Sequence, residues 1–412
     1  MLSGKNILLG ISGGIAAYKG PMIVRELVRA GATVRVVLTR GATQFVAPLA
    51  LQAVSHAPVG VDLFDPAYEE QIGHIELARW PDAILIAPAT AHLIGRAAHG
   101  LCDDLLTTVL CATTAPVVVA PAMNTQMLAN PAVQDNIARL RDRLGYQIVT
   151  PDSGELACQE VGAGRMPDPP ILLEAVARAL ATPLLQGRRV LVTAGPTIEP
   201  IDPVRFISNR SSGKMGFAIA RLAARLGAAQ VTLIAGPSSV ETPPGVARVN
   251  VESAAQMHQA VFDRVLDPHE GSRPHVVVKA AAVADWTPQQ AAEHKLKKQQ
   301  ADEQMALPMR RTRDILKELG QLDDHERPFL IGFAAETRNV EEYAAGKLLS
   351  KRADMIVGNI VLGPESAFGA DRSSVVFFDR DGRQQEHGPA AKEELAAALW
   401  SFAAQSPRWG AP

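Results

Sequence analysis

The chain contains the same short pattern twice, and this repetition restricts its fold more than any other feature. Residues Gly4–Gly10 read GKNILLG, and residues Gly187–Gly195 read GRRVLVTAG. Each copy is a basic lead-in, a short apolar strand and a turn that contains glycine. The segment Thr182–Gln186, TPLLQ, precedes the second copy and suits a junction. The pattern predicts two α/β domains, residues 1–185 and residues 186–412.

Apolar strands alternate with helical segments in both halves, which is typical of parallel sheets covered on both faces. The predicted strands of the first half are Ile7–Leu9, Thr33–Leu38, Ala83–Ala87, Pro116–Ala120 and Gln147–Val149, and its predicted helices are Ile15–Arg29, Asp103–Ala112, Pro131–Leu144 and Ile171–Ala181. The second half repeats the scheme, with strands at Arg189–Thr193, Gln230–Ala235, His275–Ala280, Phe329–Phe333, Met355–Val357 and Ser374–Asp379, and helices at Phe217–Leu226, Ser253–Leu266, Thr312–Leu319, Val340–Lys351 and Ala390–Ala404. Two stretches are predicted as loops, Pro237–Pro244 and Trp286–Pro308, and the second is long enough to suggest a functional flap.

Composition and charge exclude several classes of protein. The chain has 412 residues and a formal net charge of -2, which argues against a dedicated nucleic-acid surface. No apolar run approaches the ~18 residues of a transmembrane helix, and the strand Ile7–Leu9 follows the start too closely for a signal peptide. The three cysteines, Cys102, Cys111 and Cys158, form neither an even disulfide set nor a zinc spacing. We therefore expect a reduced, cytoplasmic protein in which Cys102 and Cys111 are buried in apolar helical segments.

The segment Thr193–Gly216, TAGPTIEPIDPVRFISNRSSGKMG, predicts a phosphate site. It follows the apolar run Val190–Val192 and precedes a helical pattern, so it has the layout in which a sheet offers backbone N–H groups and a helix N-terminus to phosphate. It is not a Walker A loop, because Ser208 replaces the first glycine and Met215 replaces the Ser or Thr after lysine, and it lacks GxGxxG. We expect a phosphorylated ligand, bound by a less common rule.

Four motifs of the first half carry candidate ligand-binding groups. The turn GISGGIAAYK holds Gly10, Ser12, Gly13 and Gly14; its glycines would let the backbone approach a ligand and Ser12 would add a hydroxyl donor, although such a turn can also be a tight connection only. A lone histidine such as His74 is more often structural than catalytic. Asn124 follows a strand end and could bind a carboxylate without adding charge. Cys158 lies in a glycine-rich loop, where a thiol is placed to meet a ligand.

These motifs together resemble a known family. The series GISGGIAAYK, GHIEL, PATA, DDLLTT, PAMN and ACxxxGxGRM, in this order and spacing, resembles the flavin-dependent cysteine decarboxylases, and TAGPTxExIDPVRxISNxSSGKMG resembles phosphopantothenate–cysteine ligase. The fused pair is similar to the bacterial bifunctional phosphopantothenoylcysteine decarboxylase/phosphopantothenate–cysteine ligases of coenzyme A synthesis. The resemblance implies two doubly wound α/β domains, a flavodoxin-like flavoprotein domain and a Rossmann-like ligase domain. It also implies FMN, Mg²⁺ and CTP, decarboxylase trimers, ligase dimers and a large homo-oligomer, often a dodecamer.

The resemblance assigns roles in the first domain. His74 is implied as the base beside the reacting thiol, Asn124 as the group that holds the departing carboxylate, and Cys158 as the proton donor to the enethiol. The implied FMN-binding residues are Gly10, Ser12, Gly13, Gly14, Thr39, Ala89 and Thr90. The chain departs from the family pattern at three places, which could alter substrate fit or flavin affinity: Gln159 for Gly, His92 for Asn, and Gly95–Arg96 for Ala-Lys.

The resemblance also assigns roles in the second domain. Lys295 belongs to a short run of lysines, and Lys347 and Lys351 lie on one face of a predicted helix. Lysines in such positions commonly just face solvent. The resemblance instead places them on the phosphates of CTP, with Asn209 at an acyl-cytidylate. The implied CTP-binding residues are Lys279, Ala280, Ala281, Asp285, Lys295, Arg313, Asp314, Ile315, Leu316, Phe333, Lys347 and Lys351. Arg205 would bind the pantothenate phosphate or support a subunit contact, and the sequence does not identify Mg²⁺ ligands.

Two alternatives stay open at the level of sequence. The first is a flavoprotein decarboxylase for another cysteine-containing substrate, with the second half adapted to a different nucleotide. The second is a flavin-binding regulatory subunit without turnover, against which the retention of His74, Asn124 and Cys158 argues.

Overall fold

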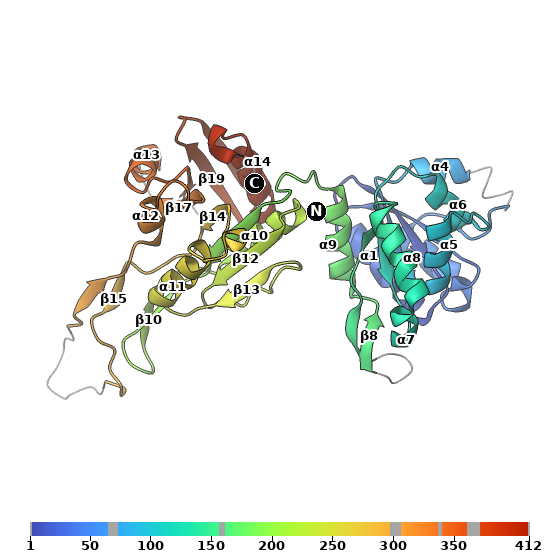
Figure 1. Cartoon of the computed structure of the whole chain (residues 1–412), viewed down its shortest axis with the longest axis horizontal. Helices are drawn as coiled ribbons and strands as arrows, with labels where there is room; N and C mark the ends of the chain where they lie inside the picture. The colour runs from blue at the N-terminus through green and yellow to red at the C-terminus, as the bar shows by residue number, and fades with distance from the viewer. Residues whose placement is uncertain are drawn as a thin grey trace. The chain divides into compact units, whose positions relative to one another are not determined.

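The computed structural model describes residues 2–64, 73–155, 161–296, 306–336, 340–360 and 371–410. The chain forms two compact units, Met1–Ala181 and Thr182–Pro412 (Figure 1). Within the described residues, no helix is both long and apolar enough to cross a membrane.

The amino-terminal unit is built on a six-stranded sheet in the order β3-β2-β1-β4-β5-β6, and all of its pairings are parallel. Its strands are β1 (Asn6–Ile11), β2 (Thr33–Leu38), β3 (Val59–Gly60), β4 (Ala83–Ala89), β5 (Val117–Pro121) and β6 (Gln147–Ile148). The helical elements are η1 (Ile15–Lys19), α1 (Gly20–Arg29), η2 (Ala42–Gln44), α2 (Pro48–Ser55), α4 (His74–Arg79), α5 (Ala91–His99), α6 (Leu105–Ala112), α7 (Thr125–Ala129), α8 (Pro131–Asp142) and α9 (Pro169–Leu180). The strands β7 (Asp152–Glu155) and β8 (Val161–Arg165) pair separately as an antiparallel hairpin.

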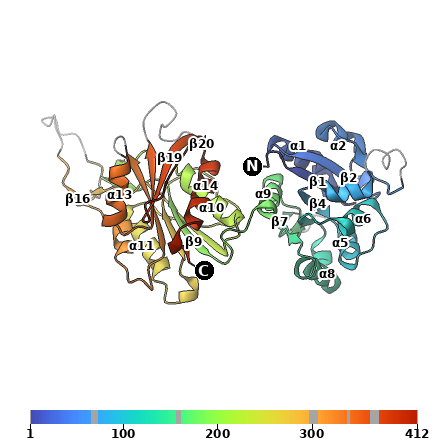
Figure 2. The ribbon, with the colours of Figure 1, turned by 90° about the horizontal axis from the view of Figure 1, so that it is seen from above.

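Alternation along the strands explains why both faces of this sheet are covered. In β1, Ile7, Leu9 and Ile11 join the core under α1 and α9, whereas Leu8 joins the core under α5, α6 and α8. Successive strand side chains point to opposite faces, so an uninterrupted apolar run needs helices on both sides. Figure 2 shows α1 and α2 on one side of β1, β2 and β4, and α5, α6 and α8 on the other.

The carboxy-terminal unit contains an eight-stranded sheet in the order β13-β12-β9-β14-β17-β18-β19-β20. Its strands are β9 (Arg189–Ala194), β12 (Gln230–Ala235), β13 (Ala247–Asn250), β14 (Val276–Lys279), β17 (Phe329–Glu336), β18 (Met355–Ile360), β19 (Arg372–Asp379) and β20 (Gln384–Ala391). One face packs on α10 (Lys214–Arg225) and α14 (Lys392–Ala404), and the other on α11 (Ala254–Val265), α12 (Ile315–Gly320) and α13 (Val340–Ser350). Two short 3-10 turns, η3 (Glu270–Ser272) and η4 (Pro407–Trp409), complete the helical elements.

The α/β fold class predicted for both halves is confirmed, with one correction. The second sheet is mixed, because β19 runs antiparallel to β18 and β20 runs antiparallel to β19. Only the short turn Arg380–Arg383 joins β19 to β20, and a parallel pair would need a longer crossover. The polar sequence of β20, QQEHGPAA, has no apolar period that would have predicted this edge strand.

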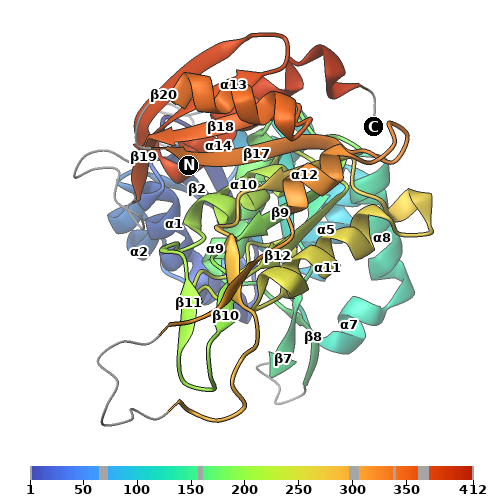
Figure 3. The same ribbon diagram turned by 90° about the vertical axis from the view of Figure 1, so that its left-hand side faces the viewer.

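Short paired strands occur in two stretches where the sequence predicts none, the segment after Thr193 and the flap Trp286–Pro308. The segment Thr193–Gly216 includes the antiparallel pair β10 (Ile198–Pro200) and β11 (Phe206–Ser208). The predicted flap Trp286–Pro308 begins with β15 (Trp286–Pro288), which pairs with β16 (Met309–Arg311), and its residues 297–305 lie outside the described residues. Figure 3 shows β10 and β11 extending away from the sheet of this unit. In both stretches, antiparallel strand pairing therefore supports the backbone, which is not a plain loop.

The prediction that Cys102 and Cys111 are buried is wrong. Both thiols are exposed, and Cys102 precedes α6 instead of lying within a helix. The side chain of Asp104 caps the first turn of α6, so the helix begins only at Leu105. The two Sγ atoms lie 2.6 Å apart. Partial burial and the neighbouring thiol raise the pKa of Cys111 to about 11.

Candidate functional site

The predicted FMN-binding residues of the amino-terminal unit gather at the carboxyl edge of its sheet. Gly13 and Gly14 follow β1, Thr39 follows β2, and Thr90 follows β4. The backbone N–H of Thr90 donates to Ser12 Oγ at 2.9 Å, and the N–H of Thr39 donates to the carbonyl of Ile11 at 3.0 Å. Three loops that are distant in sequence are thus tied together where α/β sheets bind their ligands.

The hydroxyl of Ser12 is used within the protein, contrary to its predicted role as a donor to the ligand. Ser12 is buried, and its Oγ donates to the carbonyl of Pro88 at 2.8 Å while it accepts from Thr90. A hydroxyl has one proton, so none is left for a ligand in this arrangement. Ser12 therefore fixes the spacing between the ends of β1 and β4.

Gly13 is required by a close approach between two loops. A Cβ atom at this position would lie 2.6 Å from the carbonyl carbon of Gly41, which belongs to the backbone and cannot swing aside. Among the described residues, no acceptor is paired with the backbone N–H of Gly13 or of Ile15. The turn after β1 therefore presents unused backbone donors, as a phosphate site needs.

His74 and Asn124 occupy the starts of helices. His74 is the first residue of α4, and a helix that leads into a parallel strand runs antiparallel to it, so this end of α4 faces the carboxyl edge of the sheet. Asn124 caps α7 directly after β5, where its Oδ1 accepts from the N–H of Gln126 at 2.8 Å. The hydroxyl of its neighbour Thr125 is buried and has no hydrogen-bond partner in the structure.

The hairpin β7–β8 lies against the loop that carries Asn124. The N–H of Met123 donates to the carbonyl of Gly164 at 3.0 Å, and Gly164 has a φ of 136°, which disfavours any other residue. Directly after β8, the buried Lys19 donates to the carbonyl of Met166 at 3.2 Å and to the carboxylate of Asp168 at 2.9 Å. Cys158, the predicted proton donor, belongs to residues 156–160, which lie outside the described residues.

The carboxy-terminal unit has a cavity of about 1020 Å³ at the carboxyl edge of its sheet. Gly213, Lys214, Met215 and Gly216 bring the start of the twelve-residue helix α10 to its wall. A helix N-terminus directs unpaired N–H groups and a positive dipole toward an anion. Of the predicted CTP-binding and catalytic residues, those that line this cavity are Asn209, Lys279, Ala280, Ala281, Asp285, Arg313, Asp314, Ile315, Leu316, Phe333, Lys347 and Lys351.

Burial and charge act in opposite directions on the groups of this cavity. Desolvation lowers the pKa of Lys279, which is at the end of β14; the carboxylates of Asp314 and Asp285 oppose this, and Lys347 and Lys351 reinforce it. Burial by itself would raise the pKa of Asp314, but the ammonium of Lys351, which donates to it, holds the pKa below its usual range. The cavity therefore keeps an excess of positive charge that is only partly compensated.

Two predicted residues lie elsewhere. Lys295 is exposed and is not part of the described cavity wall. Arg205 pairs with the buried carboxylate of Asp202 through Nε at 2.9 Å and donates to the carbonyl of Leu296 at 2.7 Å. Arg205 thus connects the β10–β11 hairpin to Leu296 within the predicted flap.

Two family models together match nearly the whole chain. The model described as "Flavoprotein" matches residues 1–181, and the model described as "DNA/pantothenate metabolism flavoprotein C-terminal domain" matches residues 185–406. The coenzyme A biosynthesis bifunctional protein CoaBC of Vibrio cholerae is 48% identical over 398 residues, which are 97% of each chain. The chain belongs to this family of bifunctional coenzyme A biosynthesis proteins.

A relative from another organism and a solved structure are also similar to this chain. CoaBC of Escherichia coli K12 is 49% identical over 401 residues, 97% of this chain and 96% of that protein. The crystal structure of the C-terminal domain of a CoaBC protein is 42% identical, covers 54% of this chain and 97% of that chain, and has a TM-score of 0.45. As a member of this bifunctional CoaBC family, the chain is a decarboxylase and a ligase, with a flavoprotein domain first, and the resemblance predicted from its motifs is confirmed.

Several residues of the cavity in this CoaBC family member were not predicted. Lys214 belongs to the SSGKMG motif and pairs with Asp371 at 2.5 Å. Lys392 donates to Ser373 Oγ at 2.6 Å, and burial lowers the pKa of its ammonium. The Oδ1 atom of Asn359 is buried without a hydrogen-bond partner in the structure. Only Lys214 had a signal in the sequence, since the other residues lie far along the chain from any motif.

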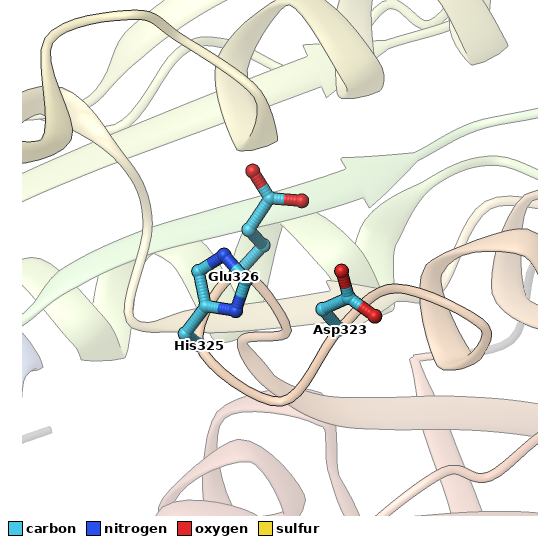
Figure 4. A group of neighbouring side chains, drawn as sticks. All are labelled: Asp323, His325 and Glu326. Atoms are coloured by element: carbon cyan, nitrogen blue, oxygen red, sulfur yellow. The ribbon is translucent and has the colours of Figure 1, made fainter.

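A group of possible metal ligands lies outside the cavity. Asp323, His325 and Glu326 offer ligand atoms that all lie within 4.8 Å of one another, and they come from the turn between α12 and β17 (Figure 4). Asp323 and His325 are exposed, and Glu326 faces Arg273 at 3.6 Å. We assign no metal to this turn, because two of the three side chains are exposed and the third already has a cationic partner.

Proposed function

We propose that residues 1–185 form an FMN-dependent phosphopantothenoylcysteine decarboxylase and residues 186–412 a CTP-dependent phosphopantothenate–cysteine ligase. The observation that carries the proposal is the cavity of about 1020 Å³, where the start of α10, Asn209 and the lysines Lys279, Lys347 and Lys351 meet. A triphosphate is the small ligand that this density of positive charge suits best. The ligase product, 4′-phosphopantothenoylcysteine, is then the substrate of the decarboxylase.

The ligase step needs a leaving group on a carboxylate. The carboxylate oxygen of 4′-phosphopantothenate attacks the α-phosphorus of CTP, which forms an acyl-cytidylate and releases pyrophosphate. The amine of cysteine then attacks the acyl carbon, loses a proton and displaces CMP, which completes the amide. Lys279, Lys347 and Lys351 would neutralise the phosphates, and the buried Oδ1 of Asn359 would accept from an N–H of the nucleotide.

Mg²⁺ is expected to enter with the triphosphate, as in phosphoryl-transfer sites generally. The carboxylates of the described cavity wall belong to Asp285 and Asp314. Carboxylate oxygens are suitable ligands for this ion, which usually also keeps substrate phosphates and water. Asp314 already accepts from Lys351, so Asp285 is the carboxylate better placed to meet the metal–nucleotide complex.

The turn after β1 fits the phosphate of FMN. Gly13 and Gly14 leave room for a close approach, and the N–H groups of Gly13 and Ile15 have no acceptor among the described residues. Gly10, Ala89 and Thr90 would contribute backbone around the same position, and Thr39 its hydroxyl. FMN supplies a reversible acceptor for two electrons.

The residues of the first unit then divide the decarboxylation among them. His74 would take the proton of the substrate thiol as a hydride leaves the adjacent carbon for the electron acceptor, giving a thioaldehyde, and Asn124 would hold the carboxylate. Carbon dioxide departs and leaves its bonding electrons on an enethiolate that sulfur stabilises. Return of the hydride to the carbon that lost it, with a proton from Cys158 to the neighbouring carbon and the proton held by His74 back to sulfur, gives the saturated aminothiol 4′-phosphopantetheine.

A single incubation tests both assignments. The purified chain should show the visible spectrum of a bound flavin. With 4′-phosphopantothenate, cysteine and CTP, it should release pyrophosphate and carbon dioxide and form 4′-phosphopantetheine. Replacing CTP by ATP measures the nucleotide preference. A colourless protein that does not bind added FMN would exclude the first assignment, and absence of pyrophosphate would exclude the second.

Asn209 provides a sharper test of the ligase. Its Nδ2 donates to the carbonyls of Ala282 and Val283 at 3.3 and 3.0 Å. The carboxamide of Asn209 therefore connects the loop before α10 to the segment that follows β14. Asn209→Asp removes these donors and adds a negative charge beside the reacting phosphate. We expect release of pyrophosphate without amide, with acyl-cytidylate detected by mass spectrometry. Amide formation at the rate of the unmodified protein would show that Asn209 has no such role.

Assembly and location complete the proposal. Ile15, Tyr18 and Met22 are exposed apolar residues next to the turn after β1, and Val204 and Phe206 are exposed on the β10–β11 hairpin. Such groups on projecting elements suit subunit contacts. We propose that the protein forms a cytoplasmic homo-oligomer, such as a dodecamer, in which the flavoprotein units form trimers and the ligase units form dimers. The molar mass measured by light scattering tests this.

A further inference from the structure

A second cavity, of about 550 Å³, lies at the opposite edge of the carboxy-terminal sheet from the nucleotide cavity. Its wall includes Arg189 at the start of β9, His275 just before β14, Phe329 at the start of β17 and Asp354 just before β18. The nucleotide cavity instead takes residues from the ends of these strands. The two cavities are therefore separated by the length of the sheet, and the function proposed above uses no residue of the second.

The positive charge of this second cavity is only partly neutralised by carboxylates. Among the described residues, five arginines and four carboxylates line it, the carboxylates being Glu270, Asp324, Glu326 and Asp354. Arg327 and Arg408 both pair with the buried Asp354, at 2.9 and 2.8 Å, and Arg273 faces Glu326 at 3.6 Å. Among the described residues, Arg188 and Arg189 have no carboxylate partner. The two guanidinium groups without a direct carboxylate contact thus belong to these adjacent residues.

Arg188 is buried despite its charge. Its residue is 5% exposed, its guanidinium donates to the carbonyl of Gly410, and it stacks over the ring of Trp409 at 4.3 Å. Burial lowers the pKa of this guanidinium. A buried charge without a counter-charge is costly, and an anion in the cavity would offset that cost.

His275 faces hydrogen-bond donors with both ring nitrogens. The backbone N–H of Arg189 lies 3.0 Å from Nδ1, and Nη2 of the same residue lies 2.8 Å from Nε2. Burial lowers the pKa of the imidazole, and the charges of Arg189 and Arg188 lower it further. Whichever nitrogen holds the proton, that N–H points at another donor. An acceptor beside the ring and the guanidinium would satisfy both groups.

We propose that this cavity binds a phosphate-type oxyanion, either free or carried on a small molecule, between Arg188, Arg189 and His275. A tetrahedral oxyanion has enough acceptors to take hydrogen bonds from two guanidinium groups and an imidazole at once. Phe329 and Trp409, whose rings meet edge to face at 5.0 Å, form an apolar wall that could cover the rest of a phosphate monoester.

Trp409 provides a reporter inside the cavity. The chain has four tryptophans, and subtracting the fluorescence of a Trp409→Phe variant isolates the signal of Trp409. We expect inorganic phosphate and glycerol 3-phosphate to change this signal saturably in the full-length protein, and potassium chloride at equal ionic strength not to. Tighter binding of glycerol 3-phosphate would identify an esterified ligand, and tighter binding of inorganic phosphate would identify the free ion.

Matched variants assign the response to this cavity. Arg189→Gln should weaken phosphate binding about tenfold or more, with ligase turnover unchanged as the check on folding. Lys347→Ala, in the nucleotide cavity, and Arg143→Gln, an exposed arginine of the other unit, should leave the Trp409 response unchanged. If Arg189→Gln fails to fold, Arg189→Lys keeps the charge without the paired donors and should still weaken binding. Absence of a saturable response, or equal affinity in Arg189→Gln and Arg143→Gln, would overturn the proposal.

Discussion

The two carboxyl edges of this protein use the same architecture with different electrostatics: one edge is close to neutral and the other is positively charged. In the amino-terminal unit, the edge is built from glycines, hydroxyls and Asn124, and its buried lysine, Lys19, is occupied by Met166 and Asp168. In the carboxy-terminal unit, nine basic and two acidic residues of the described part of the chain line the cavity. A parallel sheet therefore fixes where a ligand binds, whereas the loops decide how much charge it meets.

The difference matches the work proposed for each edge. A flavin and a departing carboxylate need neutral donors placed accurately beside the reacting carbon. An excess of lysines would hold the carboxylate in place instead of releasing it. A triphosphate carries several negative charges and needs them neutralised before its α-phosphorus can be attacked. Variants that affect one edge and leave the other unchanged test whether the two sites are independent.

The largest expected effect is at Cys158. We expect Cys158→Ala to release carbon dioxide but to form no saturated aminothiol, because the enethiol lacks its proton donor. Mass spectrometry of the product and the spectrum of the flavin, which should remain reduced, measure this. Cys102→Ser removes an exposed thiol of the same unit and is the matched control. Normal 4′-phosphopantetheine from Cys158→Ala would refute the assigned role, and a loss of ligase activity would show that the two edges are coupled.

The next largest effect is expected at Lys279. Lys279→Met keeps the length of the side chain and removes its charge, so ligase turnover should fall roughly 10²–10³-fold, with decarboxylation of supplied 4′-phosphopantothenoylcysteine unchanged. Lys5→Met, an exposed lysine of the other unit, is the control.

The pH dependence of the ligase sharpens this prediction. Since the pKa of Lys279 is lowered, its ammonium is present at low pH and is lost as the pH rises through that lowered value. Ligase turnover should therefore decline at a lower pH than an ordinary lysine would cause, and this decline should disappear in Lys279→Met. An identical alkaline limb in both proteins would mean that Lys279 does not carry the titration.

The strands that build both edges could be predicted from sequence. Thr33–Leu38 and Gln230–Ala235 were predicted with the bounds of β2 and β12, because each is a buried apolar run between clear turns. The short pairs β10–β11 and β15–β16 were missed, since three-residue strands show no period. The helical spacing of Lys347 and Lys351 predicted only a shared helix face, and the resemblance assigned them to the nucleotide; both line the cavity.

What the sequence could not provide is the identity of each side chain's partner. Nothing near Ser12 indicates that its proton goes to Pro88, which is 76 residues away. Asn359 reaches the nucleotide cavity from β18 and Lys392 from the start of α14, and neither belongs to a recognisable motif. Such contacts depend on tertiary packing, which sequence patterns predict less well than local structure.

The smallest expected effect concerns Lys19, which tests whether the edge of the flavoprotein unit depends on a held hairpin. Lys19→Met keeps the apolar stem and removes the hydrogen bonds to Met166 and Asp168 at the foot of β8. Because β7 and β8 flank the segment that contains Cys158, a small displacement should slow proton delivery more than loss of carbon dioxide. We expect formation of saturated product to fall about tenfold, with enethiol accumulating and the ligase unaffected. Asp168→Asn keeps the contact with Met166 and should have a weaker effect. Equal slowing of carbon dioxide release and proton delivery would instead indicate that Lys19 supports the whole unit, and the hairpin would then have no separate part in positioning Cys158.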